Sequence, residues 1–231
     1  MVAAVIIALG LWVVIFVPGG IAGGLISKIV SQNRKILSGV VSQVTFIAIS
    51  LSVILSFTNG PRLFGLQLDS CCVLRVILYS GVLAGFITLA SVFLFREYSY
   101  EPPFLPRSIF EFILVALLLA PFSEELMYRG VVEGYLLSHA SLLISILVPA
   151  ILFSLMHAIP YSTAPRPVLA TVLLGAFLLG VLAGYYRALS NSIIPAYASH
   201  STMNAIGFLQ YYMEKRIYLD KQKITFEQQD L

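Results

Sequence analysis

Long apolar runs separated by short polar connections dominate the pattern of this chain. Seven apolar segments can be placed, at about residues 2–27, 36–57, 72–95, 108–136, 140–160, 167–187 and 191–213. Runs this long are typical of membrane-spanning helices, because only helices or closed barrels satisfy every backbone hydrogen bond in lipid. The pattern therefore predicts an all-α fold, a polytopic transmembrane helix bundle of about seven spans, with eight helices as the alternative count.

The composition agrees with a membrane protein. Of the 231 residues, 59% are hydrophobic and 11% are charged, whereas a soluble domain has about a quarter of its residues charged. The net charge of +3 comes from scattered basic residues, which argues against a nucleic-acid partner, because such partners need a basic patch. The adjacent Cys71 and Cys72 form no C-x-x-C motif and are expected to be small apolar packing residues.

The connections predict the domain boundaries and the orientation. Residues 1–213 are expected to form one integral-membrane domain, and residues 214–231 a polar cytoplasmic tail. The first segment has no basic region before it, so it is interpreted as a membrane span rather than a cleaved signal peptide. The first, third and fifth connections and the tail hold ten of the fourteen Lys and Arg residues. The positive-inside rule therefore places the tail in the cytoplasm and the N-terminus outside.

Three ionisable residues interrupt the fourth segment in the stretch LLLAPFSEELMYRG. Charged groups inside a span are costly, so Glu124, Glu125 and Arg129 are each candidates for function. Glu125 and Arg129 are four residues apart and can pair on one helix face, a pairing that can equally serve helix packing alone. Glu124 points about 100° away and is expected to contact water or another polar group. Pro121 is expected to free a backbone carbonyl in the preceding turn.

Two later segments supply possible partners for Glu124. His157 follows Phe153 by one helical turn, and His200 and Asn204 are also one turn apart. Taken singly, these residues have a simpler interpretation as buried core or interhelical hydrogen-bonding groups. At about 1.5 Å per residue, however, the four polar side chains lie at similar depths, roughly 16 to 27 Å from the outer turns. Independent packing residues have no reason to agree in depth, so we expect the four to meet.

A carboxylate, two imidazoles and a carboxamide in an apolar cavity predict a hydrolytic site. The glutamate can act as a general base on water. One histidine can hold that water or pass a proton to the leaving amine, while the other and the asparagine can stabilise an oxyanion. Which histidine serves the leaving group stays open. Histidine and glutamate are also zinc ligands, but H-E-x-x-H is absent, so no cofactor is required and zinc stays an alternative.

The motifs together resemble a known family. E-E-x-x-x-R at 124–129, F-x-x-x-H at 153–157 and H-x-x-x-N at 200–204 are similar to the motifs of the CPBP intramembrane proteases. That family includes the type II CAAX prenyl endopeptidases and the bacteriocin-processing and immunity-associated (Abi-like) membrane proteins. The stretch YYRALSNSIIPAYASHSTMN also resembles the third motif of the family, and the likeness covers about residues 107–210.

The resemblance implies four catalytic residues. Glu124 and His157 would activate water, and His200 and Asn204 would stabilise the oxyanion. The resemblance also implies a supporting role for Glu125 and Arg129. The protein is accordingly predicted to be an intramembrane endopeptidase, with residues 1–213 as its catalytic domain. Its expected partner is a membrane-tethered substrate, either a prenylated CAAX-type protein or a precursor peptide.

The resemblance does not decide whether the reaction uses a metal, or whether this protein is catalytic at all. The family was first described as metalloproteases, but we favour a metal-free glutamate mechanism, because no carboxylate is evident behind each histidine. We expect a multi-pass protein of the cell membrane whose site opens to the cytoplasmic side. One alternative is a non-catalytic binding or bacteriocin-immunity protein of the same fold. A proton-coupled transporter using Glu124 is disfavoured by the absence of an inverted repeat.

Overall fold

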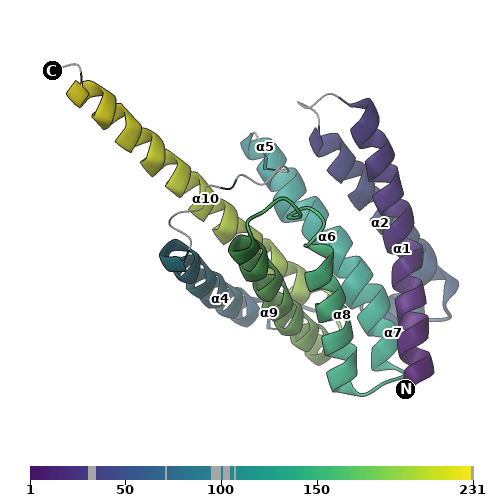
Figure 1. Cartoon of the computed structure of the whole chain (residues 1–231). Coiled ribbons are helices and arrows are strands. Elements are labelled where there is room, and N and C mark those ends of the chain that lie inside the picture. Colours follow the sequence, from purple (N-terminus) through teal and green to yellow (C-terminus); the bar gives the residue numbers. More distant parts are fainter. Residues whose placement is uncertain (31–34, 71, 95–99, 101–104, 107, 230–231) are drawn as a thin grey trace.

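The protein is a bundle of helices (Figure 1). The computed structural model describes residues 1–30, 35–70, 72–94, 100, 105–106 and 108–229. Four helices are long and apolar enough to cross a membrane by length and composition: α1 (Val2–Ile29), α2 (Lys35–Ser56), α4 (Val73–Leu94) and α9 (Arg166–Ser190). The apolar helix α8 (Leu142–Met156) is shorter, and α10 (Ile194–Gln229) is the longest. The protein is therefore an all-helical integral membrane protein.

The fourth apolar segment forms one continuous helix of alternating geometry, called the composite helix below. Its parts are α5 (Ile109–Glu111), η2 (Phe112–Leu119), α6 (Ala120–Glu125), η3 (Leu126–Glu133) and α7 (Gly134–Leu137), of which η2 and η3 are π-helical. Ser108 caps its start, because its side chain accepts a hydrogen bond from the Glu111 amide. Short π-helical stretches often occur at functional sites. Here two of them flank the adjacent carboxylates.

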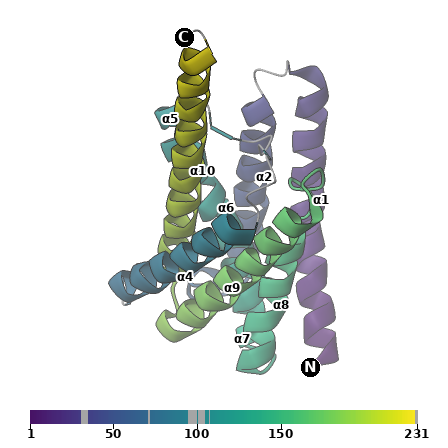
Figure 2. The same ribbon diagram turned by 60° about the vertical axis from the view of Figure 1, so that its left-hand side comes forward.

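The composite helix runs between two groups of helices. The α1–α2 hairpin packs against one side of it, and α10 packs against another, with α4 and α9 beside α10 (Figures 1 and 2). Small residues allow α1 and α2 to approach closely: Gly19 lies against the ring of Phe46, and the Gly23 carbonyl accepts a hydrogen bond from Ser38 at 2.7 Å. The chain thereby brings α2 and α10 to the same central helix.

The predicted elements agree closely with the observed ones. Each of the seven apolar segments coincides with a helix, and the all-α prediction is confirmed. The short helix α3 (Gly60–Leu63) lies in a connection where no helix was expected. Helix α10 continues through the polar tail to Gln229. The number of spans, the orientation and the domain boundaries stay predictions. Four residues used in these predictions lie outside the described ranges: Arg34, Cys71, Arg96 and Arg107.

Candidate active site

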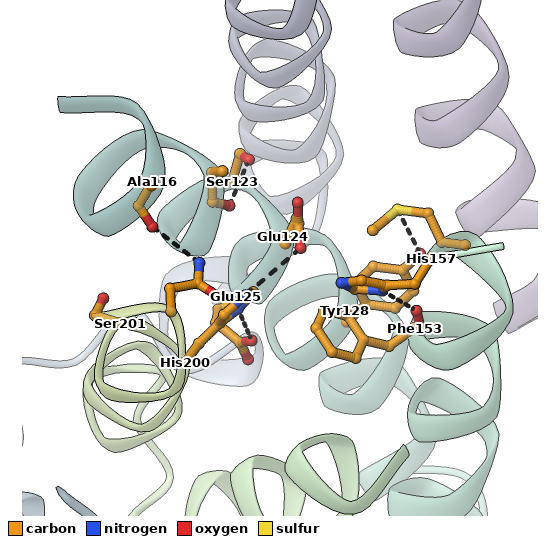
Figure 3. Close-up of polar contacts among 12 residues, drawn as sticks. Ala116, Ser123, Glu124, Glu125, Tyr128, Phe153, His157, His200 and Ser201 are labelled. Carbon is orange, nitrogen blue, oxygen red and sulfur yellow. Dashed lines mark hydrogen bonds and ion pairs between the residues drawn. The ribbon is translucent and has the colours of Figure 1, made fainter. Parts of the chain in front are cut away.

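Pro121 shapes the composite helix just before the carboxylates. Proline has no N–H, so one carbonyl of the preceding turn lacks its backbone donor. Two carbonyls of that turn accept hydrogen bonds from α10. Asn204 Nδ2 donates to the Ala116 carbonyl at 2.9 Å, the bond drawn at Ala116 in Figure 3. Ser201 Oγ donates to the Leu117 carbonyl at 2.8 Å. These bonds connect α10 to the turn in which a free carbonyl was predicted.

Glu125 is fully buried and accepts hydrogen bonds from two side chains. Its Oε1 lies 3.1 Å from Arg129 Nη1 and 2.9 Å from His200 Nδ1. The pairing of Glu125 with Arg129 predicted from their spacing is confirmed. Because a carboxylate accepts from Nδ1, the proton of the neutral imidazole lies on that nitrogen. Glu125 thus fixes the orientation of the His200 ring and leaves Nε2 pointing elsewhere.

Glu124, the neighbouring carboxylate, faces a different set of groups. The side chain is almost completely buried, and its Oε2 lies 3.8 Å from His200 Nε2. Its Oε1 accepts a hydrogen bond from Gln43 Nε2 of α2 at 3.2 Å. The two adjacent glutamates therefore act on opposite edges of the same imidazole, with Glu125 at Nδ1 and Glu124 near Nε2.

His157 approaches Glu124 from the other side. It is the residue after α8, and its Nδ1 donates to the Phe153 carbonyl at 2.8 Å, which leaves Nε2 free to act as an acceptor. Glu124 lies between His157 and His200 in Figure 3. The carboxylate and the two histidines predicted from sequence do converge, from three separate helices.

Phe153 is the aromatic centre of the site. Its ring packs edge-on against His157 and His200, at centroid distances of 4.7 and 5.2 Å. The Arg129 guanidinium lies over the same ring, 4.7 Å from its centroid. Such a contact stabilises a desolvated cation. The phenylalanine of the F-x-x-x-H motif therefore separates the Arg129 charge from both imidazoles while holding each ring in place.

A cavity of about 290 Å³ lies beside these residues, between α4, α8, α9 and α10. His157, His200 and Asn204 line it, together with mostly apolar side chains. Tyr161, in the connection after α8, also lines it, and burial raises the pKa of this phenol to about 12, so it stays protonated as a donor. A larger cavity of about 390 Å³ lies at the α7 end and contains none of the predicted site residues.

The ligand geometry for a metal is absent in the part of the chain that the structure describes. No three His, Cys, Asp or Glu side chains there are arranged to hold a metal ion. His200 uses Nδ1 on Glu125 and His157 uses Nδ1 on a backbone carbonyl, contacts that metal-ligating histidines also make. Glu125 is thus a carboxylate behind His200 that the sequence did not reveal. No step below is assigned to a metal.

Sequence reasoning missed two polar residues. Gln43 sits in a segment with no recognisable motif, and only its contact with Glu124 identifies it. Arg187, near the end of the sixth apolar segment, is fully buried. It donates to the carbonyls of Leu63 and Arg129 and to the side chain of Asn191. The sequence signal that could have found it is Asn191 four residues later, because asparagine often adopts the αL conformation that ends a helix, as it does here.

The fold and the site define an integral membrane protein with a buried glutamate–histidine centre. Residues 106–206 match the family described as type II CAAX prenyl endopeptidase Rce1-like. The match runs from the composite helix to the middle of α10, and it confirms the predicted resemblance to the CPBP and CAAX proteases. The matched family indicates a protease. Comparison with curated proteins and with solved structures gave no match.

Proposed function

We propose that this protein is an intramembrane endopeptidase of the glutamate type. One observation carries the proposal: a buried carboxylate, Glu124, lies 3.8 Å from His200 Nε2, while His157, His200 and Asn204 all line one cavity. Polar side chains from the end of α8 and from α10 thus line a space large enough for a peptide bond, and Glu124 lies next to one of them, His200. A protein that only bound a peptide would have no need of a general base beside two hydrogen-bond donors.

The first chemical step is attack by water on the scissile carbonyl. Glu124 takes a proton from the water, assisted by His157, whose Nε2 is free to accept a hydrogen bond from it. The water oxygen bonds to the carbonyl carbon, and the carbonyl π electrons move to its oxygen. This produces a tetrahedral intermediate with one negative charge.

The second step is collapse of that intermediate. One N–H of the Asn204 amide donates to the Ala116 carbonyl, and the second N–H can donate to the oxyanion. His200 supplies the other donor when Nε2 is protonated, with Glu125 stabilising the imidazolium from Nδ1. The C–N bond breaks as the proton held by Glu124 passes to the departing amine, and Glu124 returns to its ionised form. Atoms and charges then balance.

The substrate is a peptide tethered to the membrane. The apolar lining of the cavity by Ile87, Val172 and Leu179 favours a substrate whose flanking part is itself apolar. A prenylated CAAX-type C-terminus or an apolar precursor peptide fits this description. We place the protein in the cell membrane with the site reached from the cytoplasmic side.

The test is cleavage of a library of lipidated and precursor peptides by the purified protein in detergent. The Glu124→Gln variant should release no fragment above background, whereas Glu111→Gln, a carboxylate change in α5 of the same helix, should match wild type. Equal rates for wild type and Glu124→Gln would refute the proteolytic assignment. Loss of activity in chelator, restored by zinc, would refute the metal-free mechanism.

A further inference from the structure

The α1–α2 hairpin reaches the candidate active site through a side chain in the middle of α2. Gln43 Nε2 donates to Glu124 Oε1 at 3.2 Å, and Gln43 Oε1 accepts a hydrogen bond from Ser123 Oγ. The residue thus bridges two consecutive positions of the composite helix. It lies outside residues 106–206, the part that matches the protease family. The match to that family therefore does not account for it.

The contact makes the two carboxylate oxygens of Glu124 unequal. Oε1 holds an amide donor, while Oε2 faces His200 Nε2 at 3.8 Å. The hydrogen bond from Gln43 stabilises negative charge on Oε1 and uses one of its lone pairs, so Oε1 is the less basic oxygen. Proton uptake is therefore favoured at Oε2. That is the oxygen beside His200, which lines the cavity.

The orientation of the Gln43 amide is set by the same contacts. If the amide were turned over, its carbonyl oxygen would face the ionised Glu124 carboxylate, and two acceptors would oppose each other. Ser123 Oγ is within hydrogen-bond reach of Gln43 Oε1 and, at 2.9 Å, of the Ala120 carbonyl, so these two acceptors share its single proton. The share that reaches Oε1 supports the observed orientation. Ser123 is fully buried and Gln43 is partly buried.

We propose that Gln43 is a positioning residue for the general base. It holds Glu124 Oε1 by a hydrogen bond and leaves Oε2 as the oxygen that exchanges a proton. The N-terminal α1–α2 hairpin thereby becomes part of the active site. The inference rests on the proposed function. Gln43 itself does not line the cavity beside His157 and His200, so its action passes through the carboxylate.

The test replaces the amide by a thioether of similar length. In purified Gln43→Met, kcat for the best peptide of the library should fall roughly 10- to 100-fold, the effect of losing a hydrogen bond to a charged group. KM should change less than about twofold, because substrate contacts are intact. The matched control is Thr45→Val on the same helix, which removes a hydroxyl that only donates to the Val41 carbonyl. That variant should keep wild-type kcat.

A second variant addresses the orientation of the amide. Ser123→Ala should lower kcat in the same direction but by less, and the double variant Gln43→Met/Ser123→Ala should be no slower than Gln43→Met alone. This non-additivity is expected when two residues act through one contact. If Gln43→Met does not yield folded protein, Ser123→Ala carries the test with the same requirement of lower kcat and unchanged KM.

Two results would overturn the inference while leaving the protease intact. One is wild-type kcat in folded Gln43→Met. The other is a fall that appears only as a higher KM, which would assign Gln43 to substrate binding. Both presuppose that Glu124→Gln is inactive. If Glu124→Gln cleaves like wild type, the proposed function itself fails, and the two failures are thereby distinguished.

Discussion

Two buried glutamates with different surroundings stand immediately before η3 and at its end. Glu125, the last residue of α6, accepts hydrogen bonds from Arg129 and His200 through one oxygen. At the end of η3, neither oxygen of the fully buried Glu133 has a hydrogen-bond partner among the residues described. Arg187, the cation from α9, gives its hydrogen bonds to backbone carbonyls and Asn191.

The comparison separates two regions: a chemical region just before η3, where the side chains can move a proton, and a structural region at the end of η3, where they hold the backbone. Around Glu124 and Glu125, charges are aimed at the ring nitrogens of His200, where a proton can be held or moved. Around Glu133 and Arg187, the Arg187 donors hold the backbone of η3 and the last residue of α3 in place. We therefore expect mutations in the first region to affect turnover and mutations in the second to affect stability.

The largest expected effect is on turnover at Glu124. Glu124→Gln keeps the shape of the side chain but cannot take a proton from water, so kcat should fall by about 10²- to 10⁴-fold. Thermal unfolding in detergent should change little. Single-turnover cleavage assays and an unfolding curve measure the two quantities. A large drop in stability would contradict the division between the two regions.

Glu125→Gln should affect both properties. The buried cation of Arg129 loses its ionic partner, which costs about 3–5 kcal/mol of stability. His200 loses the carboxylate that stabilises its imidazolium, so kcat should also fall, by less than in Glu124→Gln. Denaturant unfolding together with cleavage rates tests this. Unchanged kcat in folded protein would show that Glu125 only stabilises the bundle.

Arg187→Met should affect stability alone. The variant loses hydrogen bonds to three acceptors in a buried region, at a cost of about 3 kcal/mol. Activity per folded molecule should stay near wild type. The matched control is Arg75→Met, an exposed arginine on α4, for which the change should be below about 0.5 kcal/mol. Lost activity in folded Arg187→Met would extend the chemical region to the far end of η3.

The smallest effect is expected at Gly184. A Cβ at this position would lie 2.9 Å from Glu133 Oε2, so Gly184→Ala should destabilise the protein by about 1–3 kcal/mol through overpacking. Gly207→Ala is the control, because a Cβ there meets nothing within 4 Å. Midpoints of thermal unfolding distinguish the two. Equal midpoints would show that the Glu133 region accommodates added volume.

The pattern of apolar runs and one residue spacing determined much of the protein. Lipid-compatible segments have to be helical, so each of the seven apolar segments could be placed as a helix from hydrophobicity. The i, i+4 spacing of Glu125 and Arg129 determined their pair, because helix geometry alone brings them together. Pro121 likewise predicted that a backbone carbonyl in the preceding turn would lack its helical donor. Each of these inferences depends on contacts within one helix, or on the solvent around it.

Only the tertiary structure decided how the helices are matched around the site. The attachment of His200 Nδ1 to Glu125, of Asn204 to Ala116 and of Gln43 to Glu124 depends on the rotation of each helix about its axis. That rotation follows from side-chain packing between distant segments, and a single residue such as Gln43 leaves no periodic signal. The sequence identified the chemical groups, and the packing determined which atom of each group faces the others.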